Sequence, residues 1–218
     1  MTYVDFTCDL LQQVPPGMPI YIRQLAEKIA KRFALEMKDA AAAASVAVKR
    51  IMDGNIIPEL RFYQKGIYFR TAVTPFGERG IDREKLIADK YMLPDKGYET
   101  GLGLLHRMGL TTQMPKEQVI ATNAARDCAR TDKKLNIIIK PPKVAVNASN
   151  RAYLQTLDAL EFMAKAPVDA EQPYEIIANF IRENNLLYEK LLFFADRYYN
   201  RNTVMQLAHT AGEGGSVI

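Results

Sequence analysis

The sequence contains only two cysteines and two histidines among its 218 residues. Cys8 and Cys128 stand far apart and match no paired-cysteine motif, so we expect reduced thiols in a cytosolic protein. This spacing excludes a disulfide scaffold. His106 and His209 have no neighbours at the spacing of zinc ligands, and we therefore expect no metal ion and no cofactor.

Long apolar runs and the common catalytic motifs are missing as well. No apolar stretch approaches the roughly 20 residues of a membrane helix, so no membrane partner is expected. Asp5 and Asp9 interrupt the first apolar residues, which argues against a signal peptide and favours a cytoplasmic location. No serine lies in a GxSxG setting, no GxxxxGK[ST] motif occurs, and Gly101-Leu102-Gly103 lacks the third glycine of a dinucleotide fingerprint. We therefore expect no enzyme activity.

The composition is that of a folded chain, with 48% hydrophobic and 25% charged residues. It excludes disordered and collagen-like proteins and suits one or two domains. Basic residues are concentrated near the start, because Ile20 to Val73 holds ten Lys or Arg against five Asp or Glu. This excess is in the range of a small nucleic-acid-binding module, although an ordinary solvated helix face is also charged.

Helical patterns dominate the first 54 residues. A helix is expected over 3–13, followed by a proline-rich turn at 15–19. An amphipathic helix should begin at Tyr21, and a second should run from Asp39, as its N-cap, to Met52, with Gly54 ending it. At about 100° per residue, the inner face of this last helix is expected to hold one set of apolar residues. That set is Ala41, Ala44, Val48, Ile51 and Met52.

The pattern then changes to period two. Residues 60–63 and 67–70 alternate as strands around a turn at 64–66, which predicts a β-hairpin. Two helices followed at once by a hairpin indicate an amino-terminal winged helix-turn-helix over residues 1–75.

A winged helix-turn-helix places its second helix in the major groove of double-stranded DNA. The small residues Ala42, Ala43 and Val46 on the outer face would let that helix approach the bases. The candidate DNA contacts are Lys49, Arg50, Arg61, Lys65 and Arg70, with Ser45 and Lys38 as weaker candidates. Two other interpretations stay open: alanines form helices with or without DNA, and such a module can serve protein contact alone.

The rest of the chain predicts a larger mixed α/β domain over 80–210 with a helical carboxy-terminal part, so the fold class is α+β. Turn formers at 74–77 and Gly80 mark the boundary. The glycine-rich end, 211–218, is expected to be a flexible tail. The expected elements are a helix from Asp82 to Met92, a turn at 97–103 leading into a helix at 104–108, strands at 118–122 and 135–140, and helices at 153–164 and 173–199.

Several of these segments resemble the abortive-infection antitoxins of the AbiEi type. The resemblance covers about residues 15–165. The order of its motifs is more specific to this family than the amino-terminal module alone, which many bacterial regulators share. The segments are Ser45-Val46-Ala47-Val48-Lys49-Arg50-Ile51-Met52, the hairpin 60–70, Thr74-Pro75-Phe76-Gly77, Gly97-Tyr98-Glu99-Thr100-Gly101, Gly109-Leu110-Thr111-Thr112-Gln113 and Ile120-Ala121-Thr122-Asn123.

This resemblance implies a two-part antitoxin of a type IV toxin-antitoxin system. The winged helix would bind the promoter of its own operon as an autorepressor. The second domain would neutralise a cognate nucleotidyltransferase-like toxin, by direct contact or by acting on the toxin's target. In the family, the DNA contacts lie on the basic recognition helix and the wing, which here correspond to Lys49, Arg50, Arg61, Lys65 and Arg70.

Two other functions remain open from the sequence. One is a stand-alone winged-helix transcription regulator whose second domain senses a small ligand. The other is a DNA-processing enzyme that uses the winged helix only for docking. The oligomeric state is open too, because a palindromic site can be read by a dimer or by two monomers.

Overall fold

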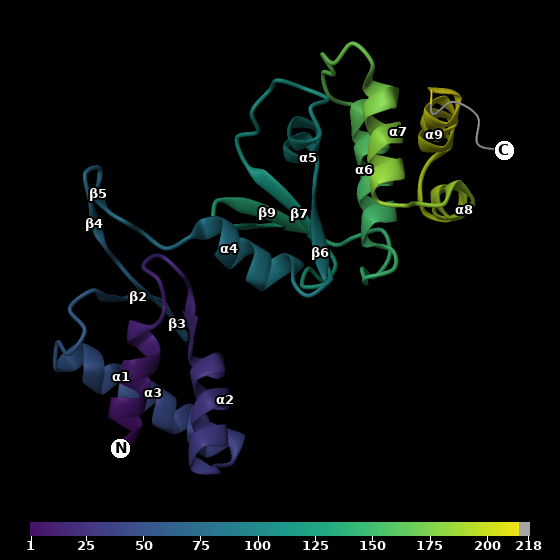
Figure 1. Cartoon of the computed structure of the whole chain (residues 1–218). Coiled ribbons are helices and arrows are strands. Elements are labelled where there is room, and N and C mark those ends of the chain that lie inside the picture. The colour runs from purple at the N-terminus through teal and green to yellow at the C-terminus, as the bar shows by residue number, and fades with distance from the viewer. Residues whose placement is uncertain (214–218) are drawn as a thin grey trace. The chain divides into compact units, whose positions relative to one another are not determined.

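The computed structural model describes residues 1–213, and it divides the chain into two compact units. The first unit spans Met1–Leu86 and the second begins at Ile87. Both combine helices with small sheets, so the chain is a mixed α+β protein, as predicted (Figure 1).

The first unit begins with three helices and a three-stranded sheet. Their bounds are α1 Tyr3–Gln12, β1 Ile20–Tyr21, α2 Ile22–Phe33, α3 Met37–Asp53, β2 Leu60–Gln64 and β3 Ile67–Arg70. The strands lie in the order β1-β3-β2 and all pairs are antiparallel. Tyr68 stands opposite both Ile20 and Phe62, so β3 is the central strand. The predicted hairpin is confirmed.

The predicted helices of this unit are confirmed, with one change at a helix start. A reciprocal pair of hydrogen bonds between Thr2 and Asp5 caps α1. Ala34 ends α2 in the left-handed conformation, at φ 53°. The sequence predicted Asp39 as the N-cap of α3, but the N-cap is Glu36. The helix starts earlier than predicted, so Asp39 falls in its first turn. Gly54 ends α3 as expected.

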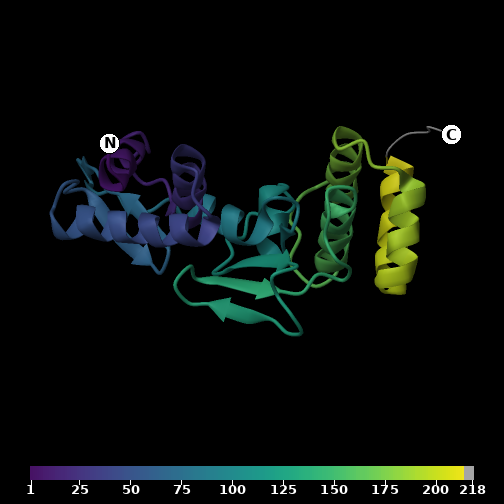
Figure 2. The same ribbon diagram turned by 90° about the horizontal axis from the view of Figure 1, so that it is seen from below.

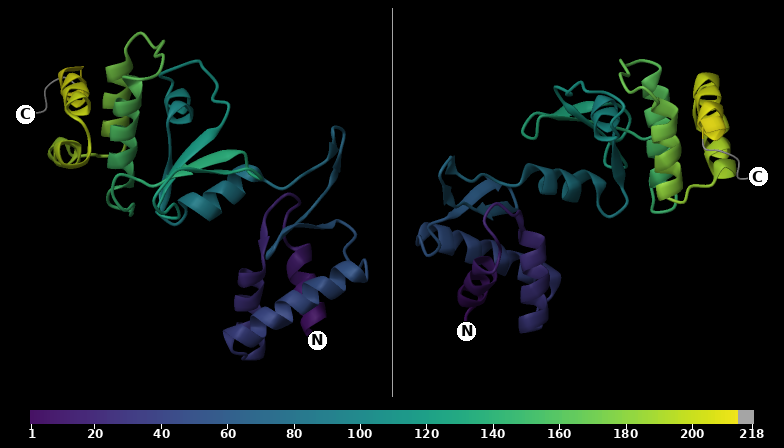
Figure 3. Two further views of the ribbon diagram at one scale, coloured as in Figure 1. Left: turned by 180° about the vertical axis from the view of Figure 1, so that it is seen from behind. Right: turned by 45° about the horizontal axis from the view of Figure 1, so that its top comes forward.

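The long helix α3 forms the centre of the unit, with α1 and α2 both packed against it (Figure 3). The buried core of the unit contains Leu11, Leu25, Ile29, Ile51 and Leu60. Of the predicted inner face of α3, Ala44, Val48 and Ile51 are buried and Ala41 and Met52 are half-buried. Ala43 is also half-buried, although it was expected outside, because two neighbouring helices cover a wider arc of α3 than one would.

The segment predicted as a boundary forms a short hairpin of β4 Val73–Thr74 and β5 Gly77–Glu78. It belongs to the first unit, where the hydroxyl of Thr71 donates to the carbonyl of Arg79 at 2.9 Å. Helix α4, Arg83–Ile87, follows and continues as the π-helical turn η1, Ala88–Met92. Asp82 caps its start through the amide of Lys85, as predicted.

A four-stranded mixed sheet opens the second unit. Its strands are β6 Gly97–Thr100, β7 Gln118–Thr122, β8 Arg130–Asp132 and β9 Ile137–Lys140, in the order β6-β7-β9-β8. Only β7 and β9 run parallel to each other. The strands predicted at 118–122 and 135–140 are confirmed, the latter beginning at Ile137.

The prediction of a turn from Gly97 was wrong, because residues 97–100 form β6. A Cβ on Gly97 would lie 2.2 Å from the carbonyl oxygen of Tyr91 and 2.7 Å from that of Ala121. Glycine therefore serves close backbone packing within a strand here, and does not mark a turn. The turn comes at Gly101, with φ 72°, and α5 then runs from Leu102 to Arg107, two residues ahead of the prediction.

Four helices follow the sheet in the described part of the second unit: α6 Arg151–Met163, α7 Pro173–Glu183, α8 Tyr188–Tyr198 and α9 Arg201–Glu213. Helices α6 and α7 stand between the sheet and the α8–α9 pair (Figure 2). The continuous helix predicted over 173–199 is wrong, because the chain breaks after Glu183. Asn185 takes a left-handed φ of 52° and the amide of Leu186 bonds to the carbonyl of Ile181, which is a helix-ending motif.

The predicted flexible tail from Ala211 is wrong for its first three residues, which extend α9. That helix is held by the burial of Thr203, Leu207 and Thr210, three residues on one face. Residues 214–218 of the predicted tail lie outside the described residues. Within residues 1–213, none of the helices is long and apolar enough to span a membrane.

Candidate nucleic-acid interface and the polar network of the second unit

The outward face of α3 carries the first group of predicted site residues. Its buried stripe, which includes Ala40, Ala44 and Val48, packs on the core of the unit and so turns the residues between them outward. The exposed residues of this face include Lys38, Ala42, Ser45, Val46, Lys49 and Arg50. The small side chains of Ala42, Ser45 and Val46 therefore occupy the middle of this face, with Lys38 before them and the cations Lys49 and Arg50 after them.

The cations on this face form no ion pair with the described residues of the chain. Among residues 1–213, no carboxylate forms an ion pair with Lys38, Lys49 or Arg50. The hydroxyl of Ser45 is used inside the helix, where it donates to the carbonyl of Ala41 at 2.8 Å. Lys49 and Arg50 are thus groups on α3 that can meet an external anion.

Lys65 lies at the turn between β2 and β3 and is exposed. Gly66 follows it with a φ of 77°, which suits a tight turn, and a Cβ there would meet no atom within 4 Å. The turn therefore projects from the sheet with one cation at its tip. Phe62, on the strand leading to it, is 56% exposed and packs edge-on against Tyr68. Sequence reasoning missed Phe62, since the alternation that buries Leu60 predicts the same face for it.

Arg61 and Arg70 are held by the protein itself. The guanidinium of Arg61 donates to the carbonyl of Pro58 at 2.5 Å and lies 3.5 Å from a carboxylate oxygen of Glu78. The guanidinium of Arg70 donates to the carbonyls of Gln12 and Val14, at 2.8 and 3.2 Å. The structure thus brings Arg70 to the end of α1, where it joins two segments of the backbone, and leaves Lys65 at the wing-like turn.

In the second unit, two of the motifs quoted above come together on paired strands. Tyr98 in β6 stands opposite Ala121 in β7, and Gly97 stands opposite Thr122. Asn123 then fixes the segment before α6, because its side chain both donates to and accepts from the backbone of Val146 at 2.8 Å. These motif residues hold the sheet to the helices that follow.

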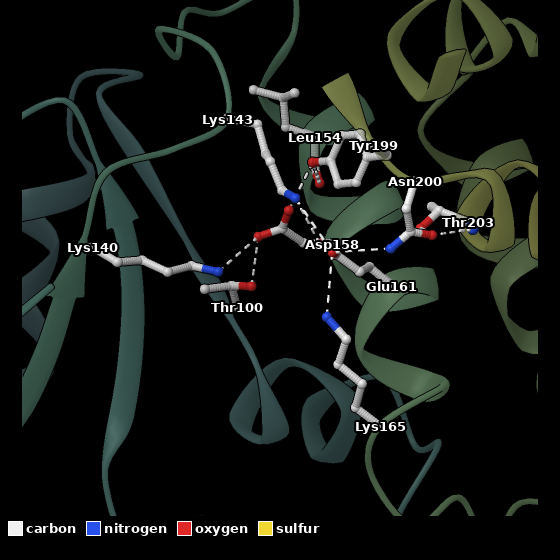
Figure 4. Close-up of polar contacts among 10 residues, drawn as sticks. All are labelled: Thr100, Lys140, Lys143, Leu154, Asp158, Glu161, Lys165, Tyr199, Asn200 and Thr203. Carbon is white, nitrogen blue, oxygen red and sulfur yellow. Dashed lines mark hydrogen bonds and ion pairs between the residues drawn. The ribbon is translucent and has the colours of Figure 1, made fainter. Parts of the chain in front are cut away.

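A buried carboxylate, Asp158 in α6, is the centre of a polar network (Figure 4). Its side chain is only 3% exposed. The hydroxyls of Thr100 and Tyr199 each donate to it at 2.7 Å, and the ammonium of Lys140 lies 3.5 Å away. One residue of α6 is therefore tied to β6, to β9 and to the end of α8.

The two tyrosines beside Asp158 remain protonated. Burial, with the nearby charge of Asp158, raises the pKa of both Tyr98 and Tyr199 far above the usual value. The hydroxyl of Tyr98 is buried with no hydrogen-bond partner among the described residues. Tyr199 also donates to the carbonyl of Leu154 at 3.2 Å. This network serves to hold the elements of the second unit together, because both carboxylate oxygens of Asp158 already accept hydrogen bonds from within the protein.

Glu161, one turn further along α6, gathers a second group of charges (Figure 4). Lys143 and Lys165 lie 3.1 and 3.3 Å from its carboxylate oxygens. Partial burial opposes ionisation, but the hydrogen bond and charge of Lys143, with Lys165, lower the pKa of Glu161 below its usual value. Lys143 also lies over the ring of Tyr199, at 4.9 Å from its centroid, so the two groups of polar residues adjoin.

A third polar cluster joins the start of the second unit to the edge strand β8. The side chains of Lys90 and Tyr91 both donate to the same oxygen of Asp132 at 2.7 Å. Although partial burial opposes ionisation, these bonds lower the pKa of Asp132 to about 2. Sequence reasoning missed this cluster, since Asp132 follows Lys90 and Tyr91 by 42 and 41 positions and β8 gave no strand pattern.

The second unit also contains a half-enclosed cavity of about 350 Å³ between α5, α6 and α7. Its lining combines apolar and polar side chains: Leu104, Arg107, Met108, Gln155, Ile176, Asn179, Phe180 and Glu183. Arg107 is already paired with the buried Glu99 at 2.6 Å. Among residues 1–213, no three His, Cys, Asp or Glu side chains are grouped so that they could hold a metal ion.

Comparison with protein-family models and with curated proteins finds no match to this chain.

Proposed function

We propose that the first unit is a winged helix-turn-helix that binds double-stranded DNA through α3 and the β2–β3 turn. The order α1-β1-α2-α3-β2-β3, with a three-stranded antiparallel sheet, supports this assignment. In this arrangement α3 is the recognition helix and the turn at Lys65 is the wing.

One observation carries the proposal: small side chains occupy the middle of the outward face of α3, and the exposed cations Lys49 and Arg50 follow them. The major groove is about 12 Å wide, and a helix inside it approaches the base edges most closely where its side chains are small. Ala42 and Val46 can then approach base edges and thymine methyl groups. Lys49 and Arg50 reach bases or phosphates, and Lys65 contacts the backbone beside the groove.

Arg70 is not part of the proposed interface, and Arg61 has a lesser place in it. Two backbone carbonyls hold the guanidinium of Arg70, and binding DNA instead would leave both without this donor. Arg61 would exchange its contact with Glu78 for a phosphate, which is a smaller change since that contact is long and exposed.

The experiment is a titration of the full chain with a duplex taken from upstream of its own gene, and with an unrelated duplex of equal length. Changing Lys49 and Arg50 together to alanine should weaken binding to both, and more strongly for the upstream duplex. Arg126→Ala with Lys133→Ala is the matched control, because it removes two exposed charges from the second unit. Equal affinities for the two double variants would reject the interface.

The resemblance to the abortive-infection antitoxins adds the second half of the proposal, in which the chain is an autorepressing antitoxin of a type IV system. Two of its motifs occupy the paired strands β6 and β7. The test is growth of cells that express the neighbouring toxin-like gene with the full chain or its Lys49→Ala/Arg50→Ala variant. Rescue by both supports neutralisation by the second unit, and rescue by neither rejects the antitoxin role.

A second candidate is a ligand-responsive transcription regulator, and the cavity between α5, α6 and α7 favours it. A volume of about 350 Å³ with apolar walls and four polar side chains at Arg107, Gln155, Asn179 and Glu183 is in the range of small-molecule sites. This account predicts a harmless neighbouring gene and a metabolite that shifts the affinity for DNA.

A further inference from the structure

An open depression of about 440 Å³ lies between α1 and α2 of the first unit. Two half-buried side chains of α1, Phe6 and Leu10, form its apolar wall. Three cations of α2, Lys28, Lys31 and Arg32, form the opposite rim. None of these five residues belongs to the proposed DNA interface.

The three cations are exposed. Among residues 1–213, none of them forms an ion pair, and the guanidinium of Arg32 instead lies 5.8 Å from the ring centroid of Phe33. Lys28 and Arg32 are also four residues apart on one helix, where like charges repel. The rim therefore favours an external group of negative charge.

The neighbouring face of α1 has the opposite charge. At about 100° per residue, Asp9 lies next to Phe6 around the helix, and Asp5 lies just beyond it. Both are exposed, and Phe6 faces α2 through its ring contact with Phe33. The surface thus presents three parallel stripes in the order basic, apolar and acidic.

We propose that this surface binds a second copy of the chain in a two-fold symmetric dimer. A two-fold axis that runs along the apolar stripe places Asp9 of each copy opposite Lys28 and Lys31 of the other. The same axis packs Phe6 and Leu10 of both copies together. Such an interface needs one self-complementary patch, which the order of the stripes supplies. The dimer goes beyond the proposed function and does not rest on it, because the association is measured without DNA.

The test is sedimentation of the full chain over a range of protein concentrations at low salt. The unchanged chain should dimerise, and added salt should weaken the dimer as it screens the exposed pairs. Asp9→Lys alone and Lys28→Glu/Lys31→Glu alone should each weaken self-association about tenfold or more, because like charges then face each other twice. Lys133→Glu, an exposed charge change in the second unit, is the control and should leave the dimer unchanged.

An equimolar mixture of the Asp9→Lys protein with the Lys28→Glu/Lys31→Glu protein should restore dimers. In the mixed pair, the lysine introduced by Asp9→Lys faces the two introduced glutamates, and the unchanged Asp9 of the other copy faces the original lysines. Both sets of contacts are then favourable, and a misfolded variant would not regain association in this way. A chain that stays monomeric, or variants that behave alike alone and mixed, would overturn the proposal and leave the depression to a different acidic partner.

Discussion

The hydroxyl of Tyr199, the residue that ends α8, donates a 2.7 Å hydrogen bond to Asp158 in the middle of α6. Asp158 is a buried carboxylate, and a buried charge is tolerated only when it is paired and hydrogen-bonded. Thr100 and Lys140 complete its partners from the sheet. This contact therefore joins the helical layers of the second unit to the sheet that carries the motif residues Tyr98 and Asn123.

Tyr199→Phe should destabilise the second unit, because it removes the hydroxyl that serves Asp158 and the carbonyl of Leu154. The expected loss is about 1–3 kcal/mol, typical of a buried bond to a charged group. Urea unfolding monitored by circular dichroism gives this loss from the transition midpoint. Tyr198→Phe is the matched control, since its hydroxyl makes no hydrogen bond among the described residues, and an equal loss in both variants would contradict the role of Asp158.

The two buried tyrosines should make the second unit sensitive to alkali. Their pKa is raised in the folded state, so the unfolded state releases these protons first, and the resulting stability is present below about pH 10 and lost above it. A pH titration followed by tyrosinate absorbance should show a late step that coincides with unfolding. Replacing both Tyr98 and Tyr199 by phenylalanine should remove that step. Persistence of the step in this variant would show that other tyrosines cause it.

Asp132 should stabilise the folded second unit at neutral pH and lose this effect in acid. Its folded pKa of about 2 lies below the usual 3.8, so its contribution is present above about pH 4 and is lost as the pH falls toward 2. Asp132→Asn should lower the free energy of unfolding at pH 7 by on the order of 1 kcal/mol, since solvent screens part of the pair with Lys90. The difference between the variant and the original should shrink between pH 4 and pH 2. Asp127→Asn, exposed in the same unit, should show no such trend.

Substitutions of Arg70 and of Lys65 should affect different properties, the first the stability of the fold and the second the affinity for DNA. Arg70→Met should cost the first unit about 1–3 kcal/mol, because the carbonyls of Gln12 and Val14 lose their donor. Lys65→Met should change stability by less than about 0.5 kcal/mol, as for most exposed positions, and should weaken DNA binding. Thermal unfolding gives the stability and a titration with DNA well below the transition gives the affinity. A stable Arg70→Met protein with weakened DNA binding would reverse the two roles.

The elements with a clear period or cap could be predicted from the sequence. The apolar spacing of Leu25 and Ile29 indicated α2, Gly54 marked the end of α3, and the alternation about Gly66 predicted the hairpin. The exposure of Lys49 and Arg50 followed from the same periodicity, since a helix with one buried stripe turns the opposite residues to solvent.

The elements whose cause lies in distant contacts could not be predicted. Gly97 suggested a turn, yet it lies within a strand because Tyr91 and Ala121 approach its backbone. The helix break at Asn185 differs, because its cause is local: asparagine tolerates the left-handed conformation, and the pair Asn184-Asn185 is a helix-end signal that the continuous apolar pattern of 173–199 obscured. Arg70 had the same cationic signature as Lys65, and only the folded chain shows that carbonyls far away in the sequence hold it.

The salt dependence of DNA binding tests the central claim most directly. Plots of log K against log salt for the full chain should be linear, because each phosphate contact releases condensed counterions. The Lys49→Ala/Arg50→Ala variant should bind more weakly and its slope should be shallower by about 1 to 2, while Arg126→Ala/Lys133→Ala should match the original chain. An unchanged affinity and slope for the α3 variant would contradict the account.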